Sequence, residues 1–334
     1  RQGALFRLLA FNPRVCRSPN FVKNQVPIAR CSRLLCSTSS KPYFFDPLER
    51  FELAEGDRPP PSTLPLLIVL PGLDGSGITA WTQYPELGLA YDIKVMRVPA
   101  DDRSDFETIA EMVAAEVAGA RSSGREAYVL GESMGAGIAM QQATQSETAA
   151  QPNGLVLVSP ATGWDRTWLG RIRYQLAELP DPLLSLVILL TSYQLLDLDQ
   201  IWITLRRVVT GERAPILNTP ERLKYTWKVV QAMPGAFAQP ASTVRYRFFA
   251  WAEPTLALGQ NFSQLSLPPT LIVAGTADLR VSAQEEAERL QAAAKGPCDV
   301  HLVPGAGHAG VTDDRLNLRE VMDRWRKAQS LRQE

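Results

Sequence analysis

A serine flanked by glycines, between a strand pattern and a helix pattern, most constrains the fold of this chain. The sequence Gly-Glu-Ser-Met-Gly at 131–135 follows a strand-like run, 126–130, and leads into a helix-like run, 134–145. A strand-to-helix turn this tight leaves no room for side chains two residues before and after the serine, so both positions need glycine. The pattern predicts that Ser133 projects from the top of a sheet as a nucleophile.

The two histidines of the chain differ in their sequence contexts. His301 alternates with apolar residues, as in a strand, whereas His308 lies in the glycine-rich loop that follows. Asp278 comes directly after another strand-like run, 270–275. The order serine, acid, histidine resembles that of α/β-hydrolases. We therefore predict a catalytic triad in which Ser133 is the nucleophile, His308 is the general base and Asp278 orients the histidine.

Other interpretations of these side chains are open. Asp278 could be an ordinary turn residue, since aspartate is common in turns. Asp313 and Asp314 follow His308 too closely to fit the order of the triad, and we expect them to open a last helix over 314–330. The spacing from His308 to Asp313 also matches the H-x-x-x-x-D motif of glycerolipid acyltransferases. We interpret that match as a coincidence, because the surrounding strand and loop are those of a triad histidine.

Two backbone N–H groups are needed to stabilise the negative charge that forms on a carbonyl oxygen under attack. The residue after the nucleophile, Met134, is the first candidate donor. The second comes from the loop after an earlier strand, 66–70, and Leu73 is our candidate. The glycines of this loop, 71–77, could alternatively bind a phosphate. Their spacing is G-x-x-G-x-G rather than the dinucleotide pattern, however, and no P-loop lysine follows.

The composition is typical of a globular protein with a large core, since 45% of the residues are hydrophobic and 21% are charged. The formal net charge is zero, but the charge is unevenly distributed. Residues 1–41 contain eight Lys or Arg and no Asp or Glu, which leaves 27 basic and 35 acidic residues elsewhere. Such an acidic body gives no reason to expect nucleic-acid binding. No motif predicts a cofactor, and two histidines are too few to predict a metal site.

The first 41 residues are typical of an organelle-targeting leader, because they are rich in arginine and free of acidic residues. A disordered or tag-derived leader is the alternative. We predict a chloroplast location, with the mitochondrion as the alternative. Three of the four cysteines, Cys16, Cys31 and Cys36, lie in this leader, so the remainder has no disulfide framework. No apolar run reaches 18 residues, so we expect no transmembrane helix.

Strand-like and helix-like runs alternate along 42–159 and again along 267–334. This alternation predicts an α/β fold with a mostly parallel sheet covered by helices on both faces. One helix is expected to start at Ser104, where Glu107 completes a capping box. Residues 160–266 interrupt the alternation, and we predict that they form a helical cap inserted between the sixth and seventh strands of the expected order.

The inserted segment is rich in leucine and contains five of the seven tryptophans. One interpretation is a lid over a site for a long acyl or isoprenoid chain, with peripheral contact to a membrane. The other is a set of cap helices that pack on the main domain. Either arrangement buries one face of the segment, so the pattern alone does not distinguish them.

Three motifs connect the chain to a known family: Leu-Pro-Gly-Leu-Asp-Gly-Ser-Gly at 70–77, Val-Leu-Gly-Glu-Ser-Met-Gly-Ala at 129–136 and Ser-Pro-Ala-Thr at 159–162. Together they resemble the esterase/lipase domain of plastid phytyl ester synthases and their diacylglycerol acyltransferase-like relatives. The resemblance covers residues 64–325. It implies fatty acyl lipid substrates, with phytol or diacylglycerol as acceptors, in chloroplasts. It also implies a second, acyltransferase-like domain, and because this chain ends at Glu334 without room for that domain, a lipid esterase becomes more plausible.

The sequence therefore predicts a serine-dependent hydrolase or acyltransferase that acts on lipid esters through an acyl-Ser133 intermediate. One alternative is an esterase that removes phytol from chlorophyll-type pigments. The other is a catalytically silent scaffold that binds a lipid or a partner. The triad does not distinguish hydrolysis from transfer, because the two reactions differ only in the molecule that resolves the acyl-enzyme.

Overall fold

The computed structural model describes residues 41–49, 51–52, 60–145, 147–193, 198–237, 239–278 and 280–333. Apart from Lys41, the predicted leader and its three cysteines lie outside the described residues. Residues 39–334 belong to one compact unit. In the described part of that unit, no helix is both long enough and apolar enough to span a bilayer.

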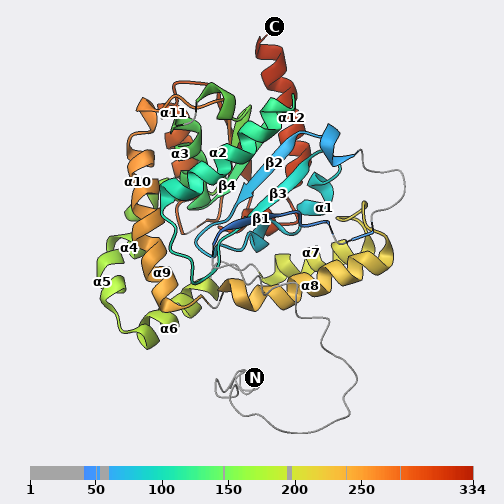
Figure 1. The fold of residues 1–334 in the computed structure, drawn as a ribbon. Helices are drawn as coiled ribbons and strands as arrows, with labels where there is room; N and C mark the ends of the chain where they lie inside the picture. The colour runs from blue at the N-terminus through green and yellow to red at the C-terminus, as the bar shows by residue number, and fades with distance from the viewer. Residues whose placement is uncertain are drawn as a thin grey trace, which may run out of the picture. The chain divides into compact units, whose positions relative to one another are not determined.

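Seven strands of the described residues form one sheet in the order β1-β3-β2-β4-β5-β6-β7 (Figure 1). Their bounds are β1 (Tyr43–Phe45), β2 (Leu66–Leu70), β3 (Asp92–Arg97), β4 (Ala127–Glu132), β5 (Gly154–Val158), β6 (Thr270–Gly275) and β7 (Cys298–Val303). Strands β2 to β7 pair in parallel, and β1 pairs antiparallel with β3. The predicted α/β fold with a mostly parallel sheet is confirmed.

Helices cover both faces of the sheet because its central strands are apolar on both sides. Leu66, Ile68 and Leu70 of β2 pack with one core, and Leu67 and Val69 pack with the other. The first face is covered by α2 (Phe106–Ser122), α3 (Gly135–Gln145), α10 (Glu253–Gln260) and α11 (Ala283–Ala293). The second is covered by α1 (Tyr84–Leu87) and α12 (Leu318–Gln333), together with residues of two inserted helices.

The segment 160–266, which we call the insert, lies between β5 and β6, and its described residues are mostly helical. Besides α10 and a π-helical turn (Phe248–Ala252), it contains α4 (Trp168–Arg171), α5 (Arg173–Glu178), α6 (Asp181–Tyr193), α7 (Leu198–Thr210), α8 (Thr219–Phe237) and α9 (Ala241–Arg247). Trp164 and Trp251 of the insert are buried in the same core as α2 and α3. The insert thus shares the core of the sheet, and its division from the rest as a cap stays a prediction.

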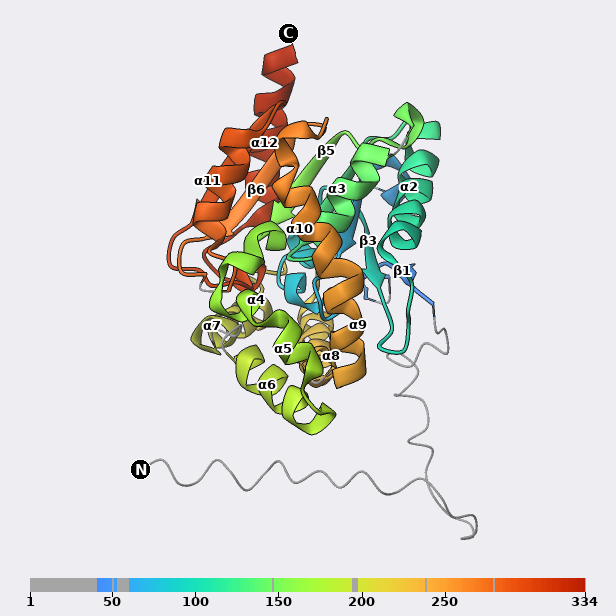
Figure 2. The same ribbon diagram turned by 90° about the vertical axis from the view of Figure 1, so that its left-hand side faces the viewer.

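Hydrogen bonds hold the insert over the carboxyl edge of the sheet. Tyr225 of α8 donates to the carbonyl of Trp81 (2.5 Å), in the connection after β2. Tyr246 of α9 donates to Arg103 O (2.5 Å), in the loop after β3. Figures 1 and 2 show α5 to α8 below the sheet, on the side that these loops face. The carboxyl edge of a parallel sheet is where such folds place their sites.

The expected capping box at Ser104 does not form. Helix α2 begins at Phe106, and its N-cap is Asp105, whose carboxylate accepts the N–H of Thr108 (2.8 Å). The N–H and hydroxyl of Ser104 instead donate to the carboxylate of Asp102. Two neighbouring residues could each cap this helix, and the acidic side chain occupies the cap because Ser104 is bound by the loop before it.

The last helix also starts later than expected. Helix α12 begins at Leu318, and Asp313 and Asp314 lie in the loop before it rather than in its first turn. Instead, the side chain of Asn317 accepts the N–H of Glu320 (3.2 Å), which is an N-cap interaction. The two aspartates are bound by arginines, and this is the physical reason that they stay outside the helix.

Candidate active site

Ser133 lies between β4 and α3 with a left-handed backbone, φ 52°. A Cβ atom at Gly131 would lie 2.4 Å from the carbonyl oxygen of Gly135, and one at Gly135 would lie 2.5 Å from Pro71 O. Both positions therefore require glycine, as the sequence predicts. The N–H of Ser133 donates to Val158 O of β5 (2.9 Å), which fixes the turn on the neighbouring strand.

His308 and Asp278 meet this serine from two other loops. His308 lies after β7, and its Nε2 is 3.0 Å from Ser133 Oγ. Its Nδ1 is 2.8 Å from Asp278 Oδ2, in the loop after β6. The side chain of Asp278 is 0% exposed and that of His308 is 13% exposed. The structure thus brings the three predicted triad residues together in one series of hydrogen bonds.

The surroundings of this pair favour an ionised aspartate and a basic histidine. Burial raises the pKa of Asp278, but His308 and the N–H groups of Arg280 and Val281 outweigh that effect and hold the pKa below its ordinary value. Burial lowers the pKa of His308, but the carboxylates of Asp278 and Glu132 outweigh it, so the pKa is raised. This combination suits a general base.

A second buried carboxyl group adjoins the serine, and it is not among the site residues predicted from the sequence. Glu132 ends β4, is 4% exposed and accepts the hydroxyl of Thr79. Burial raises the pKa of Glu132 to about 7, against the lowering effect of Thr79. The only signal in the sequence is one charged residue at the end of the otherwise apolar strand 127–132. Glu132 is not a member of the triad, but its carboxylate raises the pKa of His308.

Replacing Glu132 with glutamine should move the acid limb of the pH–activity profile to lower pH. Activity requires the neutral imidazole, so it increases as the pH rises past the pKa of His308. The carboxylate of Glu132 raises that pKa, and glutamine removes the charge while its amide oxygen can still accept from Thr79. Because the pKa of Glu132 is about 7, its carboxyl group is only partly ionised along this limb, and we expect the pH profile of kcat/KM to shift by roughly half a pH unit.

The control is Glu126→Gln, just before β4 begins, where the carboxylate binds Arg326. This variant should keep the wild-type profile, because Glu126 is at the far end of the strand from the serine. An unshifted profile for Glu132→Gln would show that its carboxylate does not influence His308.

The two predicted oxyanion donors both adjoin Ser133. Met134 follows it and is buried. Leu73 follows Gly72, whose backbone is so close to the serine that a Cβ there would lie 3.3 Å from Ser133 Cβ. Within the described residues, no hydrogen bond from the N–H of Leu73 or of Met134 is found. Both groups are thus available to a substrate oxygen, and their role stays a prediction.

The rival candidates are engaged elsewhere. Asp313 binds the guanidinium of Arg315 (2.7 Å), and Asp314 binds two arginines in and after α7. Among the described side chains, no hydrogen bond or ion pair joins either aspartate to His308. His301 lies in β7, as predicted. The H-x-x-x-x-D motif formed by His308 and Asp313 therefore does not bring its histidine and aspartate into contact.

The alternative of phosphate binding by the glycine-rich loop finds little support. The loop contains Asp74, whose carboxylate accepts the N–H of Ser76 (2.9 Å). An anion at this loop would be repelled by that carboxylate.

In the part of the chain that the structure describes, no group of three or more His, Cys, Asp or Glu side chains could hold a metal ion.

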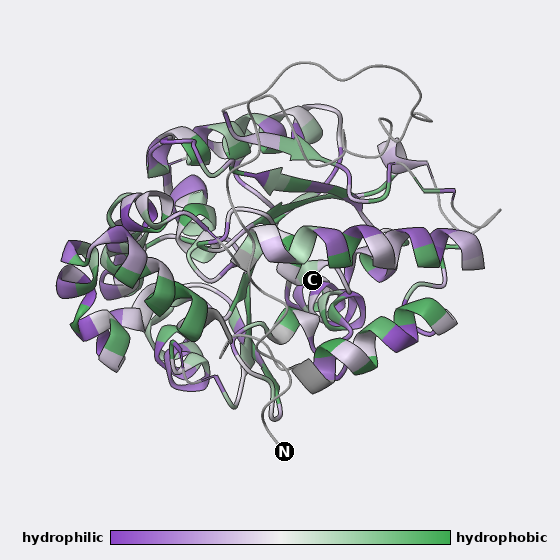
Figure 3. Cartoon of the chain, turned by 90° about the horizontal axis from the view of Figure 1, so that it is seen from below, coloured by the Kyte–Doolittle hydropathy of each residue, from purple (hydrophilic) through white to green (hydrophobic). Residues whose placement is uncertain are grey.

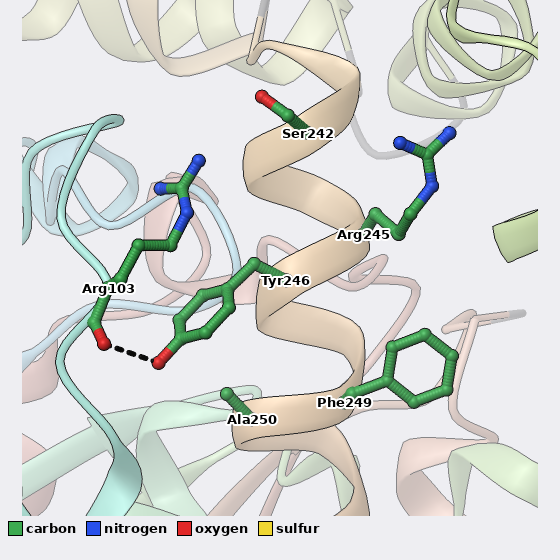
Figure 4. Close-up of a pocket in the computed structure, with 6 residues that line it drawn as sticks. All are labelled: Arg103, Ser242, Arg245, Tyr246, Phe249 and Ala250. Carbon is green, nitrogen blue, oxygen red and sulfur yellow. Dashed lines mark hydrogen bonds between the residues drawn. The ribbon is translucent and has the colours of Figure 1, made fainter.

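A wide cavity of about 650 Å³ lies beside α9 (Figure 4). Its lining consists of Arg103, Ser242, Arg245, Tyr246, Phe249 and Ala250. Neither Ser133 nor His308 borders it. Arg103 already donates to Ala100 O (2.9 Å), and Arg245 donates to carbonyl groups of the insert. The cavity is therefore separate from the site around the serine, and its cations are already bound.

Comparison with known proteins gives a family match over most of the chain. The model of the alpha/beta hydrolase family matches residues 37–320. The chain is 23% identical over 300 residues to phytyl ester synthase 1, chloroplastic, of Arabidopsis thaliana, which covers 88% of this chain and 40% of that protein. It is 32% identical over 151 residues to phytyl ester synthase 2, chloroplastic, of the same organism, which covers 44% of this chain and 20% of that protein. The chain thus spans less than half the length of either relative.

Among solved structures, MenH from S. aureus resembles the chain with a TM-score of 0.54. The match covers 87% of this chain and 100% of that protein, at 15% identity. At this identity the likeness concerns the fold alone. With the family match, it confirms the predicted fold class. The resemblance seen in the three motifs is confirmed by the family match and the two phytyl ester synthase relatives.

Proposed function

The chain belongs to the alpha/beta hydrolase family, and we propose that it is a serine-dependent enzyme that hydrolyses or transfers the acyl group of lipid esters. The observation that carries this proposal is the series of hydrogen bonds from Ser133 through His308 to Asp278, with distances of 3.0 and 2.8 Å. Its order and geometry suit a nucleophile, a general base and an orienting acid.

The first half of the proposed reaction forms an acyl-enzyme. Ser133 Oγ attacks the ester carbonyl while His308 Nε2 takes the hydroxyl proton, and Asp278 stabilises the resulting imidazolium. The carbonyl electrons move to its oxygen, which accepts hydrogen bonds from the N–H groups of Leu73 and Met134. When the ester C–O bond breaks, the leaving alkoxide takes the proton from His308, and acyl-Ser133 remains.

The second half releases the acyl group with the same residues. Water or an alcohol attacks acyl-Ser133 and gives its proton to His308, which returns it to Ser133 Oγ. Water produces a free fatty acid, whereas an alcohol produces a new ester. The choice between them depends on whether an acceptor displaces water from the site.

Lipid esters are the substrate class that the relatives favour, since both are named phytyl ester synthases. The word chloroplastic in both names supports our proposal of a plastid location. The predicted targeting leader, 1–41, is part of this proposal. A pigment-ester substrate from which phytol is removed is the second candidate, since the relatives' names contain a phytyl ester.

The test incubates the purified protein, and its Ser133→Ala variant, with a labelled long-chain diacylglycerol, with and without phytol. Free fatty acid formed only by the wild type supports hydrolysis, and a labelled phytyl ester or triacylglycerol supports transfer. A parallel incubation with chlorophyll tests the release of phytol. Equal turnover by both proteins would refute the role of Ser133. A folded wild type that binds these lipids without converting any would favour the silent scaffold.

We also propose that the insert contacts a lipid surface. Apolar side chains on several of its helices are more than half exposed: Trp168, Leu183, Leu186, Leu189, Leu190, Trp202, Leu223 and Trp227. On α6 they recur every three to four residues, and on α8 they are four residues apart, so each helix presents one apolar face to solvent. Figure 3 views the molecule from the side where these helices lie. Exposed apolar faces of this extent are typical of membrane-contact surfaces.

Replacing Trp202 and Trp227 together with alanine should weaken binding to phosphatidylcholine vesicles at least about tenfold. Each tryptophan that enters the lipid interface contributes on the order of 1–3 kcal/mol, and 1.4 kcal/mol corresponds to a factor of ten. Co-sedimentation with vesicles measures the effect. Leu331→Ala is the control, because Leu331 is also exposed but ends the distant helix α12. Equal binding by the double variant and the wild type would exclude this surface.

A further inference from the structure

Arg247 is a fully buried arginine that connects the insert to the loop beside Ser133. It ends α9 and is 0% exposed. Its Nη1 donates to the carbonyl of Leu73 (2.8 Å), and its Nη2 donates to Val98 O (2.9 Å) and Pro99 O (3.0 Å). One side chain of the insert therefore binds the loops after β2 and β3 at the same time.

The binding of this cation is unusual, because buried arginines are normally paired with carboxylates. Within the described residues, no ion pair of Arg247 is found, and Asp74 and Asp102 are the nearby acids. Burial lowers the pKa of Arg247 to about 10, so it stays cationic at neutral pH. Its two Nη groups donate to three backbone carbonyls, which fixes the relative positions of those carbonyls, while no hydrogen-bond partner of its buried Nε is found among the described residues.

The direction of the Leu73 N–H depends on the two peptides that flank this residue, and the following one contains the carbonyl that Arg247 binds. The preceding peptide is fixed as well, because Gly72 O accepts the N–H of Gly75 (3.1 Å). In a trans peptide the carbonyl and the N–H point in opposite directions, so the Leu73 N–H is directed away from this turn. Arg247 holds the peptide that follows. The two peptides that flank Leu73 are therefore both held, one by the turn and one by the insert.

The guanidinium and the loop are packed without spare room. A Cβ at Gly75, which has a φ of 69°, would lie 2.6 Å from Arg247 Nη1 and 2.7 Å from Val98 O. On its other side, the guanidinium lies over the ring of Trp251, 4.8 Å from the centroid. A substitution at Arg247 would therefore directly alter the packing of the loop that contains Leu73.

We propose that Arg247 is a positioning residue that holds the Leu73 N–H at the oxyanion of the reacting ester, so that the insert helps to build the oxyanion site. The inference rests on the proposed function of Ser133. Arg247 does not touch the reacting atoms itself. Its expected effect is therefore on the stabilisation of the tetrahedral intermediate and not on the binding of the lipid chain.

The experiment compares Arg247→Met and Arg247→Lys with Arg245→Met. Arg245 is on the same helix, but its guanidinium binds carbonyls at 177 and 179 and the carboxylate of Asp181, within the insert. Two quantities are measured: the hydrolysis of p-nitrophenyl decanoate, and inhibition by a long-chain trifluoromethyl ketone. The serine attacks the carbonyl of this ketone, and the resulting tetrahedral adduct carries an oxyanion. Circular dichroism and thermal unfolding establish which variants fold.

We expect Arg247→Met to lower kcat roughly 10²-fold and to weaken the binding of the ketone by a similar factor, with KM nearly unchanged. Arg247→Lys, which keeps the charge but cannot reach all three carbonyls, should lose less. Arg245→Met should behave as the wild type. If Arg247→Met does not fold, the inference is tested with Arg247→Lys instead. Gly75→Ala, whose Cβ would displace the guanidinium, must then also lower kcat and the affinity for the ketone together.

A folded Arg247 variant with unchanged kcat, or with reduced kcat but unaltered affinity for the ketone, would overturn the inference. Ser133→Ala is assayed beside these variants. Activity retained by Ser133→Ala would mean that the proposed function itself is wrong. An inactive Ser133→Ala beside fully active Arg247 variants would reject only the role of Arg247.

Discussion

Ser133→Ala should lower kcat by about 10⁴- to 10⁶-fold, and adding His308→Ala to it should cost almost nothing more. The reason is that Nε2 of His308 lies 3.0 Å from Ser133 Oγ and has no proton to take once the hydroxyl is gone. Residues that act as one unit do not contribute additively. The measurement is kcat for an acyl ester with the two single variants and the double variant, compared with the wild type.

Ser159→Ala is a matched control for the nucleophile. Ser159 follows the neighbouring strand β5 and also has a left-handed backbone, φ 42°. It is fully buried, and in the described part of the chain its hydroxyl has no hydrogen-bond partner. This variant should keep near-wild-type activity. Additive losses in the Ser133 and His308 double variant would mean that the two residues act independently, which the proposed mechanism does not allow.

The features that were predictable from the sequence are those set by local sterics and chain order. The glycines at 131 and 135 follow from the closeness of the strand-to-helix turn, and the structure gives the distances that require them. Parallel strands end at one edge of the sheet, so loops after β4, β6 and β7 can meet there. The sequence therefore placed Ser133, Asp278 and His308 at one edge, and the structure brings them into hydrogen-bond distance.

The contacts that the sequence did not reveal join residues far apart in the chain. Arg247 and Leu73 are 174 positions apart, and nothing in the segment 241–247 indicates a buried cation. Glu132 appears in the sequence as one more polar residue beside the serine, because the residue that binds its carboxylate, Thr79, lies 53 positions away. The insert illustrates the same limit: the helical pattern predicts an apolar face but not what covers it.

Asp278→Asn should lower kcat by about 10³- to 10⁴-fold while the fold is preserved. Asp278 Oδ1 accepts the N–H groups of Arg280 (2.8 Å) and Val281 (3.3 Å). An asparagine would keep its carbonyl oxygen there and turn its NH₂ group toward His308 Nδ1. That nitrogen would then have to accept, which puts the imidazole proton on Nε2, facing Ser133. In this tautomer the histidine cannot take the hydroxyl proton.

The same variant should also move the acid limb of its residual activity to lower pH. Asp278 contributes more than Glu132 to the raised pKa of His308, and without its charge the burial of the imidazole lowers that pKa. Asp313→Asn is the control, because Asp313 is bound by Arg315 in a neighbouring loop and should leave both kcat and the profile unchanged. Normal kcat in Asp278→Asn would remove Asp278 from the mechanism and leave the orientation of His308 to other groups.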